Sequence, residues 1–227
     1  MAACAFVALG VWQVHRLHWK HDLIARVNAR VHAAPVALPP SRQLASEDRQ
    51  AHEYLRVALS GSYQPGQTAL VRAATDLGSG YWAMTVLVTR DGRKVWINRG
   101  FMPDDATPAT ARRTVPSGPV EVTGLVRIDE PGGSLLQANK PALDRWYSRD
   151  LAALSTSRHA GETAPVFVDA QKETAKEPAG VTLPVPGLTV IRFPDNHLSY
   201  ALTWFALAVL SLFGIFLAWR RAGRSLA

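Results

Sequence analysis

The feature that most constrains this chain is a run of 22 residues without a charged side chain, from Leu198 to Trp219. At about 1.5 Å per residue, a helix of this length spans about 33 Å, which is enough to cross the hydrocarbon layer of a bilayer. Trp204 and Trp219 stand near its two ends, as aromatic residues do at membrane interfaces. A buried helix of a soluble domain rarely stays uncharged for so long. We therefore expect residues 195–219 to form a transmembrane helix.

The charges after this run predict its orientation. Arg220, Arg221 and Arg224 follow directly, and an excess of basic residues in a short flank marks the cytoplasmic side of a membrane helix. Residues 220–227 are therefore predicted to be a basic cytoplasmic tail. The long segment before the helix then lies outside, in a periplasm or an intermembrane space.

The N-terminal end is also apolar. Its first 14 residues carry no charge, but about 20 are needed to cross a bilayer. Either Met1 lies inside a longer helix or the segment inserts only partly; a cleaved signal peptide is disfavoured because no basic residues precede the run. We predict an N-terminally incomplete first transmembrane helix over 1–20 and a helical stalk over 21–34, where apolar residues keep a helical period until Pro35.

Charge and cysteine content exclude several classes of function. The net charge is +7, yet the basic residues are scattered and form no stripe with aromatic residues between them, so binding of nucleic acid is not predicted. Basic residues do gather beside the apolar ends, which suits contact with anionic lipids. Cys4 is the only cysteine, which rules out an intrachain disulfide and a cysteine-based metal cluster.

Residues 35–194 are predicted to form one external, mainly antiparallel β domain, a barrel or a sandwich with one or two short helices. Asp91-Gly92 separates two apolar runs and predicts a tight hairpin turn. Residues 107–118 and 171–187 are rich in Pro, Gly and polar residues, so they are predicted to be long loops. A short helix is expected over 149–154, with Ser148 as its cap. The predicted strands begin at Tyr54 and cover Ala69–Arg72, Tyr81–Arg90, Arg93–Arg99, Val120–Ile128, Val166–Asp169 and Leu188–Arg192.

The chain contains no common catalytic signature, neither GxSxG, HExxH, GxGxxG nor a phosphate-binding loop, and we do not expect an enzyme. His15, His18 and His21 recur at spacings of three. On a helix, His15 and His18 could face the same way, and so could His18 and His21, because residues three positions apart lie on neighbouring turns. They are read as interfacial side chains, with a metal or haem role as the alternative.

His197 is different because it stands at the entry to the C-terminal helix. Asp195 or Asn196 can cap that helix and place the imidazole in its first turn. Tyr200 and Trp204 follow at one and two turns, so aromatic rings border the same face. The residues alone leave two interpretations, an interfacial histidine and a ligand for haem iron.

The chain resembles the Surfeit locus 1 family of cytochrome c oxidase assembly factors in four patches that follow one another from the first helix to the last. They are Leu9-Gly10-Val11-Trp12-Gln13 with Arg16 and Trp19-Lys20; Asn98-Arg99-Gly100-Phe101 with Pro103; Trp146-Tyr147 with Arg149-Asp150; and Asn196-His197-Leu198 with Tyr200 and Thr203-Trp204-Phe205. Asp195 departs from the family, which often has Asn there.

The resemblance implies two membrane helices around an external domain, and a role in delivering or inserting haem a into oxidase subunit I. It implies that His197 is an axial ligand of haem a. As a physical hypothesis beside the resemblance, Tyr200 and Trp204 would border the macrocycle. Arg16 and Lys20 would pair with its propionates, with ordinary contact to lipid headgroups as the alternative.

The resemblance also implies the partners and the location of the protein. The expected partners are oxidase subunit I, the haem a synthesis machinery and the lipid bilayer. The expected location is a bacterial inner membrane, with the main domain periplasmic. The alternative is an interaction protein or accessory subunit that stabilises subunit I without binding haem. In it, Asn98, Arg99, Gly100 and Phe101 belong to a docking loop, unless Gly100 and Pro103 only make a turn at the end of a strand.

Overall fold

A computed structural model describes residues 2–46, 49–134, 137–176, 178, 180–189 and 195–224, without the side chains of 218 and 221–224. The predicted contribution of Arg221 and Arg224 therefore lies outside the described side chains. The chain divides into two compact units, one made of Met1–Ala29 with Ile191–Ala227 and the other of Arg30–Val190.

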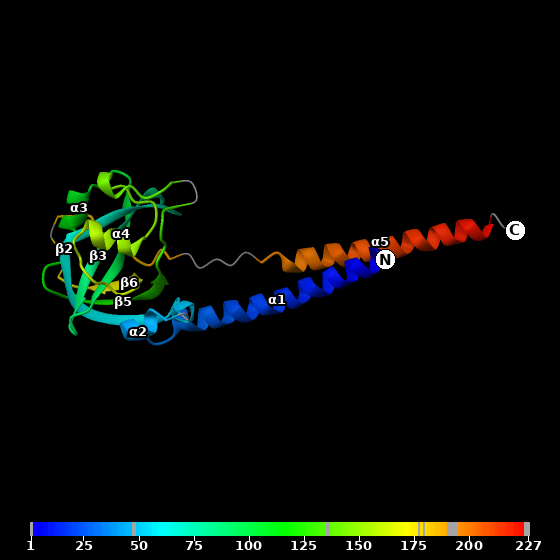
Figure 1. Cartoon of the computed structure of the whole chain (residues 1–227), viewed down its shortest axis with the longest axis horizontal. Helices are drawn as coiled ribbons and strands as arrows, with labels where there is room; N and C mark the ends of the chain where they lie inside the picture. Colours follow the sequence, from blue (N-terminus) through cyan, green and yellow to red (C-terminus); the bar gives the residue numbers. More distant parts are fainter. Residues whose placement is uncertain are drawn as a thin grey trace. The chain divides into compact units, whose positions relative to one another are not determined.

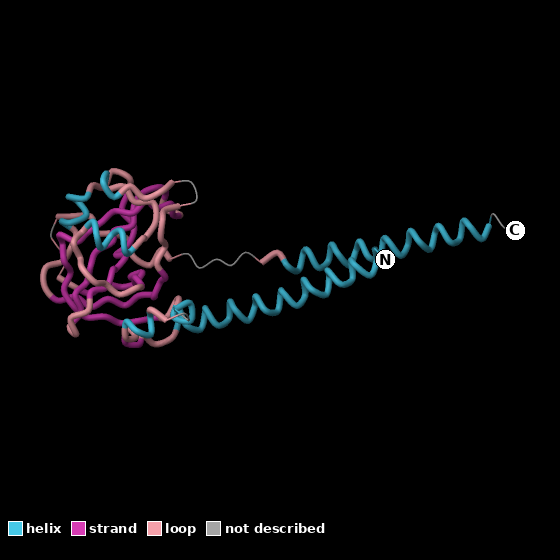
Figure 2. The backbone as a smooth tube through the Cα atoms, in the orientation of Figure 1, coloured by secondary structure: helices cyan, strands magenta, loops and turns pink. Residues whose placement is uncertain are grey.

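The second unit is a closed β-barrel of five strands (Figure 1). The strand β2 pairs with β3 on one side and with β5 on the other, which closes the sheet in the order β2-β3-β4-β6-β5. The pairing of β4 with β6 is parallel and the other four pairings in the barrel are antiparallel. The prediction of a mainly β domain is confirmed as a mixed barrel (Figure 2). Its strands are β2 (Arg56–Thr75), β3 (Gly78–Thr89), β4 (Lys94–Pro103), β5 (Pro119–Ile128) and β6 (Val166–Thr174), and β1 (Val36–Ala37) adds to β2 in parallel.

The strand β2 corrects the prediction of two separate strands near Tyr54 and Ala69–Arg72. It runs through both segments, and its register against β3 shifts between Tyr63 and Thr68. Pro65-Gly66 lies inside this shift. Proline cannot donate to a ladder and glycine favours a bulge, so the pair bends the strand without ending it.

The predicted hairpin turn at Asp91-Gly92 is confirmed, with Gly92 at φ 83° and the Thr89 N–H donating to the Arg93 carbonyl at 2.8 Å. The predicted helix is α4 (Leu151–Ser157), and its cap is Asp150, whose side chain accepts from the Ala153 N–H at 3.0 Å. The prediction that Ser148 caps this helix is wrong, because its hydroxyl donates to the Glu130 carbonyl.

Three other expectations change in the structure. The predicted loop over 107–118 contains α3 (Pro108–Arg113), and the predicted loop over 171–187 begins inside β6. Of the strand predicted over 188–192, residues 188 and 189 are not in a strand, and 190–192 lie outside the described residues. The short helices α2 (Ser41–Leu44), η1 (Arg49–His52) and η2 (Pro141–Leu143) were not predicted.

In β4 the sheet is apolar on both faces, because successive side chains of a strand point to opposite sides. In β4, Val95 and Ile97 join one buried cluster while Trp96 joins another. The second cluster lies beneath α4, whose Leu151 and Leu154 belong to it. Burial on both faces explains why β4 is nearly continuously buried, whereas the first half of β2 and the start of β5 alternate between buried and exposed residues.

The first unit consists of two helices, α1 (Ala2–His32) and α5 (His197–Arg224). The helix α1 is continuous through the predicted membrane segment and the predicted stalk, and α5 continues past Trp219 to Arg224. Among the described residues, one helix is long and apolar enough to cross a membrane, over His197–Leu217.

Candidate binding site on the helix pair

The helices α1 and α5 pack against each other in opposite directions. The rings of Phe6 and Trp204 stack with centroids 5.8 Å apart, whereas the next contacts toward the end of α1 involve the start of α5. A Cβ atom on Gly10 would lie 2.6 Å from the Phe205 ring, so only glycine admits this ring. Ala201 is 2% exposed. Small residues thus let the two helices approach closely, as they do in membrane helix pairs.

His197 is the first residue of α5, and the side chain of Asp195 accepts from its backbone N–H at 3.2 Å. The expected capping of this helix by Asp195 or Asn196 is therefore confirmed for Asp195. The cap fixes the direction in which the helix begins, and with it the position of the imidazole ring.

The His197 ring binds the other helix. Its Nδ1 lies 2.8 Å from Oε1 of Gln13, a residue that is 9% exposed. With the Gln13 amide oxygen as the acceptor, the donor is the Nδ1–H of the ring, and Nε2 is the ring nitrogen that takes no part in this bond. A hydrogen bond of this kind, from the far ring nitrogen, is how proteins orient a histidine that ligates a metal.

A second polar contact lies one step further along both helices. Nε2 of His21 is 2.8 Å from Oδ2 of Asp195. Together Gln13, His21, Asp195 and His197 form a polar group at the start of α5, which we call the helix-pair site. Sequence reasoning missed Gln13 and the pairing of His21, although a lone amide inside an uncharged run was a signal for the first.

The remaining residues predicted to bind haem are placed as follows. Tyr200 is 54% exposed, one turn after His197, whereas the Trp204 ring is partly covered by Phe6. Arg16 and Lys20 follow Gln13 at three and seven positions on α1, which puts them on its face of the helix. The Arg16 guanidinium lies 3.9 Å from the centroid of the Trp19 ring. Their roles toward haem stay predictions.

The three closely spaced histidines of α1 do not converge. His18 bonds to the Val14 carbonyl of its own helix, and His21 binds Asp195. In the described part of the chain, no three His, Cys, Asp or Glu side chains form a group that could hold a metal ion.

Asn98, Arg99, Gly100 and Phe101 lie inside β4, and the side chains of the three non-glycine residues are at most 5% exposed. The expectation that they form a docking loop is corrected, because these side chains pack inside the barrel unit. Phe101 also pairs through its backbone with Val185. A Cβ on Gly100, which has φ 129°, would lie 2.3 Å from the Val185 carbonyl oxygen.

The amide of Asn98 belongs to a buried polar network around Asp169, which is 3% exposed. Asn98 donates to this carboxylate at 2.8 Å, Thr189 at 3.0 Å and Arg127 at 3.2 Å. Arg149 approaches the same carboxylate at 3.5 Å and lies over the Phe167 ring. Two of the four family patches thus meet at one carboxylate, and their contribution in the described structure is to hold the barrel.

A second buried pair joins Arg99 to Glu173. The Arg99 guanidinium donates to both carboxylate oxygens of Glu173, at 2.9 and 3.1 Å, and to the Thr114 carbonyl. The Tyr63 hydroxyl donates to the same carboxylate at 2.7 Å. Burial, and then the negative charge of Glu173, raise the pKa of Tyr63 well above its usual value.

Comparison with known proteins relates the chain to one family along most of its length. Residues 1–209 match the sequence model described as the SURF1 family. Surfeit locus protein 1 of Mus musculus is 32% identical over 222 residues, which cover 90% of this chain and 69% of that protein. The Homo sapiens protein of the same name is 30% identical over 216 residues, covering 88% and 69%. A SURF1-like protein of Caenorhabditis elegans is 30% identical over 227 residues, covering 90% and 68%.

Proposed function

The chain belongs to the SURF1 family, and from that membership we propose that it assists the assembly of a haem–copper cytochrome c oxidase by holding haem a at the helix-pair site. The observation that carries this proposal is the hydrogen bond between His197 and Gln13. It occupies Nδ1 and leaves Nε2 as the ring nitrogen that would bind the iron.

The residues around His197 fit the other parts of the ligand. The exposed ring of Tyr200 offers an apolar edge to a flat macrocycle. Arg16 and Lys20 are cations on the α1 face that carries Gln13, which suits two propionates. Haem is cargo in this proposal, so no covalent step is required of the protein. Ligation by His197 alone would allow the haem to be released. We propose that the haem comes from the haem a synthesis machinery and that oxidase subunit I accepts it.

In this proposal the helix-pair site lies at the surface of a bilayer. Both α1 and α5 would cross the inner membrane of a bacterial cell, with both chain ends cytoplasmic and the barrel periplasmic. The long apolar span of α5 supports one crossing, and the opposite direction of α1 supports a second. His197, at the start of the apolar span, would then lie at the outer interface, where a macrocycle meets lipid and its propionates meet water.

Complementation of a cell that lacks this protein tests the function. We expect His197→Ala to leave the amount of the protein unchanged while haem a in the membranes falls to the level of the deletion. The matched control is His15→Ala, an exposed histidine on α1, which should restore wild-type haem a. If His197→Ala restores it equally well, the protein stabilises subunit I without carrying haem.

A further inference from the structure

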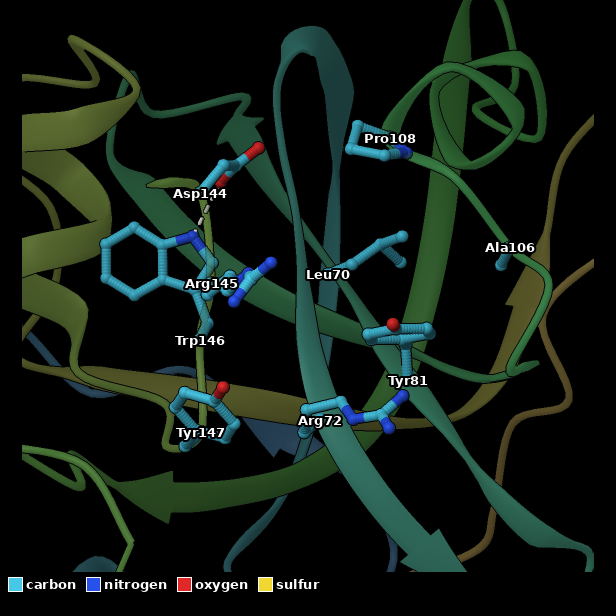
Figure 3. A pocket seen from close by; sticks show the side chains of 9 residues that line it. All are labelled: Leu70, Arg72, Tyr81, Ala106, Pro108, Asp144, Arg145, Trp146 and Tyr147. Atoms are coloured by element: carbon cyan, nitrogen blue, oxygen red, sulfur yellow. Dashed lines mark hydrogen bonds between the residues drawn. The ribbon is translucent and has the colours of Figure 1, made fainter. Parts of the chain in front are cut away.

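The barrel unit contains a recess of about 340 Å³ (Figure 3). Leu70 and Arg72 form its floor, because alternate residues of β2 face the same side. Tyr81 of β3 lies opposite Arg72 in the register. The segment Asp144–Tyr147 forms one wall, and Ala106 with Pro108 forms the other.

The Asp144–Tyr147 wall is fixed by hydrogen bonds. The Trp146 carbonyl accepts from the Arg72 N–H at 2.8 Å, and the Trp146 indole donates to Asp144 at 2.7 Å. Arg158 forms an ion pair with the same carboxylate. These contacts hold Asp144 at φ 52°, a backbone conformation that costs free energy in a non-glycine residue. The recess is therefore preorganised.

The charges that line the recess do not cancel. Arg72 pairs with Asp104, and Asp144 pairs with Arg158. Arg145 is exposed, and no carboxylate of the described residues lies within ion-pair distance of it. In the view of Figure 3 its side chain extends from the wall toward Leu70. One positive charge is left over beside the apolar side chain of Leu70.

We propose that this recess binds a small organic carboxylate, with the acid group on Arg145 and the apolar body over Leu70 between Tyr81 and Tyr147. A guanidinium matches a carboxylate with two parallel hydrogen bonds. The volume is near the lower end of ligand pockets and equals that of about eleven water molecules at roughly 30 Å³ each. The site lies in residues 70–147, so it does not depend on haem binding by the helix pair.

Calorimetric titration of the detergent-solubilised full chain with benzoate tests the proposal, with benzamide as the uncharged probe of the same shape. We expect saturable binding of benzoate and none of benzamide. Arg145→Gln should weaken benzoate at least about tenfold, the loss of a charged hydrogen bond. Ala106→Trp, which fills the recess, should abolish binding. The matched control is Arg90→Gln, an exposed arginine away from the recess.

A second comparison of probes distinguishes two sources of the carboxylate, the C-terminus of a peptide and a free acid. Acetyl-alanyl-leucine binding more tightly than benzoate assigns the site to a peptide terminus, and the reverse order assigns it to a free acid. No saturable benzoate binding, equal binding of benzamide, or an unchanged affinity of Arg145→Gln would overturn the proposal. Haem loading should be the same in all these variants.

Discussion

Asp169 shows what a single buried residue does in this barrel. Its carboxylate meets two arginines, an amide and a hydroxyl that come from four separate segments of the chain. Sequence patterns placed Asn98 and Arg149 in notable patches, but they could not tell packing from docking, since a short polar motif reads the same in either role. Whether these side chains are buried decides between the two roles. Their burial depends on strands that are distant in the sequence.

Asp169→Asn should lower the free energy of unfolding of the barrel by about 3 kcal/mol, because it removes the charge that Arg127 and Arg149 share inside the protein. Urea unfolding of the full chain, followed by tryptophan fluorescence, measures the change. Asp105→Asn, at an exposed carboxylate, is the control. Equal midpoints for the two variants would contradict a structural role of Asp169.

The stability of the barrel unit is expected to depend on pH through Glu130. Burial opposes its ionisation, but hydrogen bonds from Arg149 and its charge outweigh burial and lower the pKa of Glu130 below 4.5. A carboxyl with a lowered pKa contributes stability above its unfolded value, and this contribution is lost as the pH falls through the folded value.

Glu130→Gln should therefore melt at a lower temperature than wild type at neutral pH, and the difference should shrink as the pH falls from about 6 to about 3. Thermal unfolding across this range measures it, with Glu121→Gln at an exposed site of β5 as the control. A difference that stays constant with pH would show that the ionisation of Glu130 contributes nothing.

At the scale of elements, the sequence predicted β3 and β4 from the Asp91-Gly92 turn between them, and β5 from its alternation of apolar and polar residues. It divided β2 in two at Gly61, whereas the structure carries the strand through Gly61 and through the register shift between Tyr63 and Thr68. The sequence did not predict which residues of α1 contact which residues of α5. Gly10 and Ala201 are small residues whose packing role becomes visible only in the structure of the helix pair.

Gly10→Val should separate the helices, because its Cβ alone would overlap the Phe205 ring. Spin labels on Cys4, the only cysteine, and on a Val209→Cys variant report the separation by pulsed electron paramagnetic resonance. We expect a longer and broader distance in Gly10→Val. Gly214→Val on α5 is the matched control, since its Cβ would have no neighbour within 4 Å. An unchanged distance in Gly10→Val would contradict the packing.

At the scale of the whole molecule, composition and hydropathy predicted an apolar C-terminal helix and a mainly β domain, and both are present. They could not place His197 against Gln13, because 184 positions separate the two residues. The family patches singled out His197, and the structure adds the hydrogen bond between its ring and Gln13. The position of the His197 ring thus depends on its contact with Gln13, which a hydropathy profile cannot predict.

The proposed topology makes a direct prediction about accessibility. In a Cys4→Ser background, Ser117→Cys in the exposed loop before β5 should react with a membrane-impermeant maleimide in intact cells whose outer membrane is open. A cysteine added after Ala227 should react only after the inner membrane is broken. Labelling of the added cysteine in intact cells would contradict two membrane crossings.

The absorption spectrum of the protein purified after co-expression with the haem a synthesis machinery tests the central claim most directly. We expect haem a bound to wild type and to His15→Ala, and none above background in His197→Ala. Gln13→Leu, which removes the partner of Nδ1, should retain less haem than wild type, by about tenfold to a hundredfold in affinity. Equal haem a in wild type and in His197→Ala would contradict the account.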